Sequence, residues 1–572
     1  AEVPEDCWER EAAVKDIMAA AVRPLGSGRP SVEAPLHEVI DYRYVFHMHP
    51  ATVNGMTCAE KGEETCRDLF PEALWVEYTD PGYTLAAVVA DRLAEARAER
   101  GTQPKMIFLQ NHGVFVGADR LDEIESLYDT IMETLDRAYA EAGVETRLAP
   151  AELDEDAAFD LAPRLRTWLG SDEARAVVVS GAPFEPARGP LSPDHIVYAK
   201  SYPLAADAVT GEDVDAFEQK HNYRPKLVVL PGKAAFAADV ALKNARGVLA
   251  IARDASLVQQ LTEAFGGPKY LSDREREFIE NWEVESYRKK VAAAAGGVQR
   301  VRNRLCVVTG AAQGFGLGIA RGLAEEGATV IIADINAEGA RQTAQELQEE
   351  FGSSRALAAE VNIADEASVE RMVREITLAC GGVDLFVANA GVLRAASVKE
   401  FDKRDWDLVT NVNYTGYFLC TKHVSRVMAA QAEAGPGPWM DIVQINSKSG
   451  LEGSNRNAAY AGGKFGGIGL TQSFAKELVD DCIKVNSVCP GNFFDGPLWS
   501  DPEKGLFVQY LQTGKVPGAE TIEDVRKAYE AKVPMGRGCR PGDVLKAILY
   551  IMEQDYETGQ AVPVTGGQVM IR

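Results

Sequence analysis

Residues 305–316, LCVVTGAAQGFG, decide how the second half of this chain folds. The apolar run Leu305–Thr309 predicts a short buried strand, which leads directly into a glycine-rich turn and then into a helical segment that reaches Glu326. Glycines in such a turn let the backbone bend sharply and approach a pyrophosphate, whose charge the N-terminus of the next helix stabilises. The stretch therefore predicts a phosphate-binding turn.

The next strand adds the acid that a dinucleotide site needs. Residues 329–333 predict a second strand, which ends at Asp334. A carboxylate at this place accepts both ribose hydroxyls of NAD and repels the additional phosphate of NADP. Strand and helix patterns alternate through residues 297–572, which indicates a Rossmann-type, doubly wound parallel sheet. We expect this region to be an NAD-binding domain.

A tyrosine and a lysine four residues apart supply candidate chemistry. Tyr460 and Lys464 lie on one face if their segment is helical. A cationic lysine beside a phenol lowers the phenol's pKa from its usual value near 10, so Tyr460 can act as a base on an alcohol or as an acid on a ketone. We expect Ser447 to hydrogen-bond the same substrate oxygen, and Asn413 to hold a water that links Lys464 to solvent.

This half resembles the short-chain dehydrogenase/reductase superfamily in the order and spacing of its motifs, namely TGAAQGFG at 309–316, ANAG at 388–391, Asn413, Ser447 and the Tyr460–Lys464 pair. The resemblance covers residues 297–572 nearly completely. It implies NAD as the cofactor, bound by Gly310, Gln313, Gly314, Phe315, Gly316, Asp334, Asn362, Ile363, Asn389, Ala390, Gly391, Tyr460, Lys464, Pro490 and Gly491.

A narrower resemblance concerns the substrate. Residues 445–473, 532–539 and 564–570 resemble the sorbitol-6-phosphate 2-dehydrogenases, which implies NAD-dependent oxidation of a polyol or a polyol phosphate to a ketose. Lys448 and Arg456 flank the catalytic segment; they are either phosphate contacts or solvated surface charges. The irregular glycine, proline and aromatic content of residues 492–517 predicts a substrate lid.

Three histidines in the first 148 residues predict a metal site. Residues 44–50 predict a strand, so His47 and His49 point to the same side of it. The strand predicted at 106–109 delivers His112 at its end, which completes the three-ligand set of an open catalytic zinc site. Glu33 is the nearby carboxylate for moving a proton, and His37 is a candidate neighbour on the same helix face.

These motifs, with the PSVE stretch at 30–33, resemble the class II aldolase/adducin family, and fuculose- and rhamnulose-phosphate aldolases are the closest chemistry. The resemblance implies that His47, His49 and His112 bind Zn²⁺ and that Glu33 is the acid/base in retro-aldol cleavage of a ketose phosphate. Members of that family usually carry phosphate-gripping loops before the glutamate. We therefore expect an aldolase-like domain at 1–148 that lacks its N-terminal part, either because the sequence is incomplete or because this half is defective.

Residues 149–296 show no motif with chemistry, and His195 has no partner at metal-ligand spacing. We expect an α/β connector, bounded by the small-residue stretch 292–297. The order aldolase-like region, connector and dehydrogenase resembles the bifunctional aldolase/short-chain dehydrogenases. The patterns predict strands at 176–180, 196–199 and 226–230, and helices at 234–252 and 274–295.

Composition excludes several classes of protein. The net charge of −25 discounts nucleic acid and anionic lipid as partners, and no apolar run is long enough for a membrane helix. Nine scattered cysteines without a CxxC motif, and an acidic N-terminus unlike a signal peptide, predict a cytoplasmic protein. Both resembled families commonly form tetramers, so we expect a homo-oligomer that acts on small molecules.

Three readings of function stay open. The dehydrogenase makes the ketose that the aldolase cleaves, or it acts on the small aldehyde that the aldolase releases. Alternatively the N-terminal region is a non-catalytic assembly domain, as in adducin. The resembled aldolases cleave ketose 1-phosphates whereas the resembled dehydrogenase makes a 6-phosphate, so the two halves need not share an intermediate.

Overall fold

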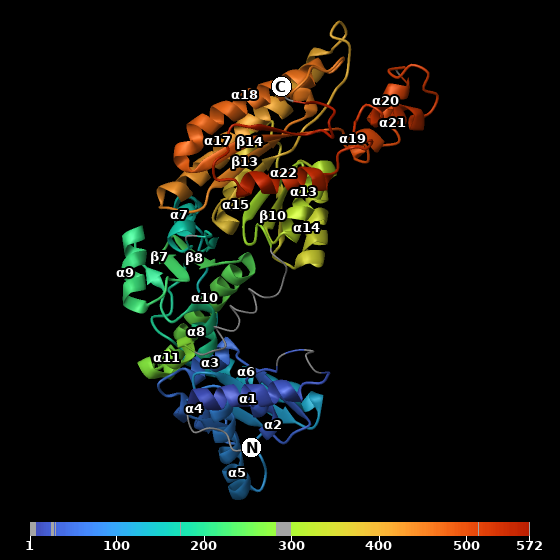
Figure 1. Ribbon diagram of the computed structural model, residues 1–572. Helices are drawn as coiled ribbons and strands as arrows, with labels where there is room; N and C mark the ends of the chain where they lie inside the picture. The colour runs from blue at the N-terminus through green and yellow to red at the C-terminus, as the bar shows by residue number, and fades with distance from the viewer. Residues whose placement is uncertain are drawn as a thin grey trace.

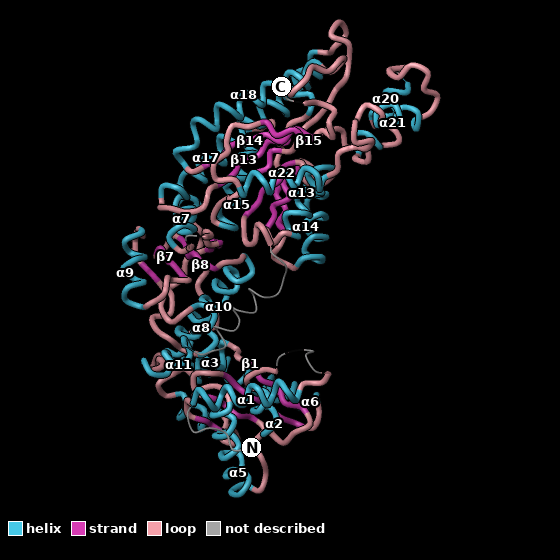
Figure 2. Tube along the Cα trace, in the orientation of Figure 1, coloured by secondary structure: helices cyan, strands magenta, loops and turns pink. Residues whose placement is uncertain are grey.

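The computed structural model describes residues 7–24, 28, 30–171, 173–281, 299–512 and 514–570. They form three bodies stacked along one long axis, with the N-terminal body at one end and the C-terminal body at the other (Figure 1). Each body contains one sheet with helices around it (Figure 2), so the predicted α/β class is confirmed. Among the helices described, none has the length and apolar character needed to span a membrane.

The C-terminal sheet is parallel throughout, with the strand order β11-β10-β9-β12-β13-β14-β15. The order reverses between β9 and β12, and in such sheets a ligand crevice lies at the carboxyl ends of the strands at that point. The predicted doubly wound sheet is confirmed. Its strands are β9 (Leu305–Thr309), β10 (Thr329–Asp334), β11 (Ala356–Glu360), β12 (Leu385–Ala388), β13 (Met440–Ile445), β14 (Ile483–Pro490) and β15 (Ala561–Val564).

Helices cover both faces of this sheet (Figure 1), which is why its strands are apolar on both sides. Val308 packs with the helices of one face and Val307 with those of the other. One face carries α13 (Gly314–Glu325), α14 (Ala337–Phe351) and α22 (Pro541–Glu553). The other carries α15 (Glu366–Cys380), α17 (Gly416–Glu433) and α18 (Ala458–Leu478); α16 (Lys403–Thr410) precedes α17.

Residues 492–517 combine irregular segments with two short helices. They contain α19 (Pro497–Ser500) and α20 (Leu506–Gln512), and α21 (Ile522–Glu530) packs against α20. The unit projects from the sheet (Figure 1) and has its own core, because its aromatic residues pack together and bury their apolar surface. That core includes Phe494, Trp499, Phe507 and Tyr510.

The N-terminal sheet has the order β1-β4-β3-β2, in which only β2 and β3 run parallel. Its strands are β1 (Tyr44–Met48), β2 (Leu74–Val76), β3 (Met106–Leu109) and β4 (Gly113–Ala118). The helices are α1 (Cys7–Ala21), α2 (Ala34–Val39), α3 (Ala51–Thr57), α4 (Gly62–Leu69), α5 (Tyr83–Arg100) and α6 (Leu121–Ala142). The turn between β3 and β4 carries His112, next to the end of β1.

The middle sheet has the order β5-β8-β7-β6, and only β6 and β7 run parallel. Its strands are β5 (Val177–Gly181), β6 (Leu204–Ala205), β7 (Leu227–Leu230) and β8 (Ala234–Asp239). The helices are α7 (Glu155–Trp168), α8 (Pro193–Ala199), α9 (Gly211–His221), α10 (Leu242–Thr262) and α11 (Asp273–Asn281). The predicted division at residue 148 falls between α6 and α7, and the division at 296 lies outside the described residues.

Two predicted elements of the middle region are wrong. Residues 196–199 belong to α8, which starts with Pro193 and is capped by the Ser192 side chain, not to a strand. Residues 234–239 form β8, and the helical part of 234–252 begins only at Leu242. Alanine favours helices, but β8 lies between two pairing strands, and that tertiary pairing overrides the local preference.

A buried ion pair joins the middle region to the dehydrogenase region. The Arg166 guanidinium in α7 donates to Asp384 Oδ2 at 2.8 Å and to Gln431 Oε1 at 2.5 Å. The side chains of Arg166 and Asp384 are 0% and 3% exposed. Asp384 also accepts a hydrogen bond from the backbone of Leu305, the first residue of β9. The two bodies are therefore held in a defined orientation.

Candidate active sites and metal centre

The turn after β9 has the shape that a bound pyrophosphate needs. Gly310 and Gly314 have φ values of 64° and 63°, which favour glycine. A Cβ at Gly316 would lie 2.2 Å from the Gly310 carbonyl oxygen and 2.6 Å from Asn389 Nδ2. Asn389 Nδ2 in turn donates to the carbonyl oxygen of Thr309 at 2.9 Å. Only glycines fit, so the backbone and the start of α13 stay open to a ligand.

Asp334 ends β10 beside this turn. Its Oδ2 accepts a hydrogen bond from the Ala312 backbone at 3.0 Å, and its Oδ1 accepts one from the Asn336 backbone at 2.9 Å. These bonds fix the carboxylate at the mouth of the glycine-rich turn. An anion held there favours two ribose hydroxyls over a phosphate.

The other predicted cofactor residues lie at the carboxyl ends of the same parallel strands. Asn362 and Ile363 follow β11, Ala390 and Gly391 follow β12, and Gly491 follows β14, which ends at Pro490. Gln313 is the residue before α13, and the Phe315 ring lies 4.8 Å from that of Phe493. The fold brings all of these residues to one edge of the sheet.

Tyr460 and Lys464 share a face of α18 as predicted. Lys464 Nζ lies 5.6 Å from the centre of the Tyr460 ring and donates to the Ile445 carbonyl oxygen at 2.8 Å. Burial lowers the pKa of Lys464 to about 8. The structure does not show the predicted lowering of the phenol's pKa. Burial raises the pKa of Tyr460, and a hydrogen bond with Ser447 offsets only part of that rise. Ser447 therefore does reach Tyr460.

Asn413 lies in a π-helical turn (Asn411–Thr415) between α16 and α17. Its side chain donates to the Val392 carbonyl oxygen at 2.8 Å and accepts from the Val392 backbone nitrogen at 2.9 Å. A small cavity of about 10 Å³ is lined by Asn413 and Lys464 among others. That volume suits one water molecule, as the predicted role of Asn413 requires.

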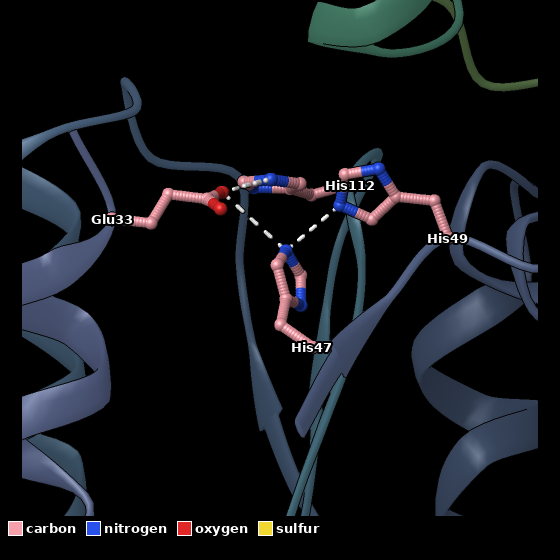
Figure 3. A group of neighbouring side chains, drawn as sticks. All are labelled: Glu33, His47, His49 and His112. Atoms are coloured by element: carbon pink, nitrogen blue, oxygen red, sulfur yellow. Dashed lines mark hydrogen bonds and ion pairs between the residues drawn. The ribbon is translucent and has the colours of Figure 1, made fainter. Parts of the chain in front are cut away.

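The three predicted histidines and Glu33 converge in the N-terminal body (Figure 3). His49 Nε2 lies 2.8 Å from His47 Nε2, and His112 Nε2 lies 3.0 Å from Glu33 Oε1. One potential ligand atom from each of the four residues lies within 4.8 Å of the others. This donor set, three imidazoles and a carboxylate, fits a divalent metal such as Zn²⁺.

Hydrogen bonds on the far side of two imidazoles fix their orientation. His47 Nδ1 lies 3.0 Å from the Val114 carbonyl oxygen, and His49 Nδ1 lies 2.7 Å from Asp194 Oδ2. A proton on each Nδ1 leaves the Nε2 lone pair for a metal. Gly113 makes room for this arrangement, because a Cβ there would lie 2.4 Å from His49 Cδ2.

Electrostatics favour a charged carboxylate at Glu33 and a neutral imidazole at His112, whereas the hydrogen bond with Asp194 raises the pKa of His49. Burial opposes the charge of Glu33, but its hydrogen bonds with His112 and His47 hold the pKa of this carboxyl well below its usual range. Burial also lowers the pKa of His112. His37 is not one of the four converging residues; its ring packs edge-on against Phe115 at 5.2 Å.

Asp194 is a site residue that the sequence did not reveal, since it lies in the middle region from which we expected no chemistry. It belongs to the first turn of α8. The next residue, His195, has a structural place: its ring nitrogens lie 3.0 Å from Ser192 Oγ and 3.0 Å from Asp254 Oδ2. Because Asp194 lies 145 residues from His49 in the sequence, the two residues form no motif with a recognisable spacing.

Four cations, Lys448, Arg456, Lys515 and Lys532, lie near one another. Burial and the neighbouring cations Lys532, Arg456 and Lys448 lower the pKa of Lys515. Lys515 Nζ lies 3.9 Å from the Tyr510 ring, Lys532 Nζ lies 4.3 Å from the Tyr529 ring, and these two rings stack at 5.4 Å. Within the described part of the chain, none of the four cations forms an ion pair with a carboxylate.

Comparison with known proteins identifies the C-terminal half. A model of the short chain dehydrogenases matches residues 304–499. The sorbitol-6-phosphate 2-dehydrogenase of Escherichia coli strain K12 is 39% identical over 271 residues, which are 47% of this chain and 99% of the relative. The chain belongs to the short-chain dehydrogenase family. The crystal structure of sorbitol-6-phosphate 2-dehydrogenase SrlD from Erwinia amylovora shares 40% identity with this short-chain dehydrogenase, at a TM-score of 0.43 over 46% of this chain and 100% of that one.

This short-chain dehydrogenase also matches, over residues 8–138, the model of the class II aldolase and adducin N-terminal domain. An uncharacterized oxidoreductase of Bacillus subtilis strain 168 is 24% identical over 594 residues, which are 94% of this chain and 83% of the relative. The predicted fusion is therefore confirmed: an oxidoreductase of the short-chain dehydrogenase type follows an aldolase-type domain in one chain.

Proposed function

We propose that the C-terminal domain oxidises a secondary alcohol of a polyol phosphate to the corresponding ketose phosphate, with NAD as the oxidant. The observation that carries this proposal is the meeting of Tyr460, Ser447 and Lys464 at the sheet edge that also holds the glycine-rich turn. The similar enzyme from Escherichia coli, named for sorbitol 6-phosphate, supports the class of substrate. Asp334 supports NAD rather than NADP.

The chain's own residues perform the proton transfer in this mechanism. Ser447 orients the substrate hydroxyl toward Tyr460, whose phenolate takes the hydroxyl proton. Lys464 stabilises the phenolate, and the cavity beside Asn413 holds the water through which the proton leaves. When bound, oxidised NAD supplies the hydride acceptor and a positive charge that favours the phenolate.

The four cations support a phosphorylated substrate. The protein carries a net charge of −25, so a group of cations that forms no ion pair with a carboxylate among the described residues is unusual on its surface; the charge of Glu452 acts on Lys448, one of the four. Lys448 follows Ser447 directly, and Arg456 lies four residues before Tyr460. Lys515 and Lys532 come from the helical unit of α19, α20 and α21, where they lie over the Tyr510 and Tyr529 rings. A phosphate on the substrate would neutralise the mutual repulsion.

We propose further that the N-terminal domain cleaves a ketose phosphate with a divalent metal, Zn²⁺ in our reading. His47, His49 and His112 would hold the ion, and the ionised Glu33 would move the proton. The metal, when bound, acts as a Lewis acid on the ketose oxygens. The two sites lie in the two end bodies of the molecule (Figure 1), so a ketose made at one site must leave it before reaching the other.

The test is NADH formation with alditol phosphates, free alditols and lactaldehyde-type aldehydes. Reaction with alditol phosphates alone supports the proposal, and cleavage products should then appear in the same tube. Reaction only with small aldehydes would place the dehydrogenase after the aldolase. Reaction only with free polyols would overturn the proposal that the substrate is phosphorylated.

Two variants separate the two sites. Tyr460→Phe should lower NAD reduction by about 10²–10⁴-fold while NAD still binds. His47→Ala should lose zinc yet keep NAD reduction. If the wild-type protein cleaves no ketose phosphate, an assembly role for the N-terminal domain is favoured.

We also propose a cytoplasmic homo-oligomer. The free thiols at all cysteines whose side chains are described suit a reducing compartment. Light scattering of the purified chain would give its subunit number, and a monomer would contradict the oligomer.

A further inference from the structure

The middle body repeats the sheet architecture of the N-terminal body. In both, a four-residue strand, a three-residue turn, a six-residue strand and a long helix follow one another: Met106–Leu109, Gly113–Ala118 and the helix from Leu121 in one, Leu227–Leu230, Ala234–Asp239 and the helix from Leu242 in the other. The strand orders and directions also correspond, β1-β4-β3-β2 with β5-β8-β7-β6.

Strand pairing shows which residues correspond at the metal site. His47 pairs with Phe115 in β4, and Ser180 pairs with Phe236 at the same position of β8. Ser180 therefore stands where the first body has His47. By the same register, Ala182 stands in place of His49 and Lys233 in place of His112. The middle body has the fold but none of the three imidazoles.

The residue that makes room for the histidines also differs between the two bodies. Gly113 is required in the first body because a Cβ there would lie 2.4 Å from His49 Cδ2. Ala234 occupies the corresponding position, and its Cβ is tolerated because Ala182 replaces the histidine. The residues at these positions therefore agree that the middle body has the same sheet without the metal-ligand set.

The middle body instead contacts the metal site of the first body. Asp194 Oδ2 lies 2.7 Å from His49 Nδ1. Asn111, the residue before His112, has a φ of 54° and donates from Nδ2 to the carbonyl oxygens of Leu191 at 2.8 Å and Lys269 at 2.7 Å. Both segments that deliver ligands from the strand ends are therefore held by the same neighbouring body.

We propose that residues 149–281 are a second, metal-free copy of the aldolase-type fold that serves as a built-in partner, with Asp194 as the residue that positions His49 for the metal. This inference rests on the proposed metal function. Asp194 is a positioning residue rather than a ligand, because its carboxylate bonds the ring nitrogen that faces away from the other three groups. The Ser192 cap and the His195–Asp254 contact fix the position of α8, and α8 holds Asp194 in place.

The test measures metal affinity in the full chain. Asp194→Asn keeps the size of the side chain but removes the charge that orients and polarises the imidazole, and loss of such a partner lowers metal affinity by about 10–100-fold. Competition with a chromogenic chelator gives the Zn²⁺ affinity, and the visible spectrum of the Co²⁺ form reports the ligand geometry. Asp194→Glu should recover part of the affinity. Asp215→Asn, an exposed acid of the same region, is the matched control and should leave affinity unchanged.

NAD reduction should be unchanged in Asp194→Asn, which shows that the chain is folded; Asp194→Ala serves as a second variant if the first does not fold. Wild-type affinity and an unaltered Co²⁺ spectrum in the folded variant would overturn the inference. A wild-type chain that binds no divalent metal would instead overturn the proposed metal function, so the two failures are distinguishable.

Discussion

Arg166 and Asp384 form a fully buried ion pair between the middle region and the first strands of the dehydrogenase sheet, with Nη2 and Oδ2 at 2.8 Å. The pair is completed by hydrogen bonds to Gln431 and to the Leu305 backbone. Burial opposes the charge of Asp384, but Arg166 and its neighbouring guanidinium groups lower the pKa of that carboxyl. The contact explains how two bodies with separate sheets keep one orientation.

We expect Arg166→Ala to destabilise this junction by about 3–5 kcal/mol, because it leaves Asp384 charged, buried and unpaired. Urea unfolding followed by tryptophan fluorescence measures the loss. Arg164→Ala is the control, since Arg164 is an exposed arginine of the same helix and its pair with Glu433 is worth little. Equal stability of the two variants would contradict the role given to the buried pair.

The pH dependence of alcohol oxidation should follow Tyr460. Burial raises the pKa of this phenol, and the base form is the phenolate. We therefore expect kcat/KM for NAD reduction to rise with pH from neutral toward alkaline values, because the fraction of phenolate grows until pH passes the pKa of the tyrosine. Ketone reduction uses the protonated phenol, so its rate should stay level until pH approaches the pKa of Tyr460 and fall only above that. Initial rates in both directions check this, and a rate of oxidation that decreases over that range would refute the assignment of Tyr460 as base.

Cofactor choice should depend on Asp334. Its carboxylate is fixed by two backbone donors at the edge of the glycine-rich turn, where the ribose of a dinucleotide is bound in this fold. Asp334→Asn removes the charge that repels a 2′-phosphate, so the ratio of kcat/KM for NAD over NADP should fall at least about tenfold. The same kinetics on Glu338→Gln, an exposed acid of the next helix, should show an unchanged ratio.

Local sequence signals predicted the features that local geometry controls. The strand and turn at 305–316 were correct because four apolar residues in a row and three glycines specify them without help from distant residues. His47 and His49 were placed together by the two-residue period of a strand. By contrast, Asp194 reaches His49 across 145 residues of sequence, and no periodicity connects them. The helix predicted from Ala234 failed because strand pairing with β5 and β7 outweighs the helical preference of alanine.

The four cations show the same limit of prediction from sequence. Lys448 and Arg456 could be noticed because they adjoin Ser447 and precede Tyr460. Lys515 and Lys532 are brought to them only by the packing of α20 against α21, with Tyr510 stacked on Tyr529. Lys515 lies in the stretch predicted as a lid and Lys532 begins the motif at 532–539, but neither stretch shows from sequence alone that it lies near Lys448 and Arg456.

Substrate preference provides the sharpest check on whether the substrate is phosphorylated. Lys515 is half-buried, lies 3.9 Å above the Tyr510 ring and has three cations for neighbours. If it contacts a substrate phosphate, Lys515→Gln should raise KM for an alditol phosphate by about tenfold, the worth of one charge-assisted hydrogen bond in a partly exposed site. KM for the unphosphorylated alditol should stay the same or fall, because mutual repulsion among the cations is relieved. Lys504→Gln, an exposed lysine at the start of the same unit, controls for a general change of charge. An equal effect of Lys515→Gln on both substrates would show that the lysine supports the lid rather than the phosphate.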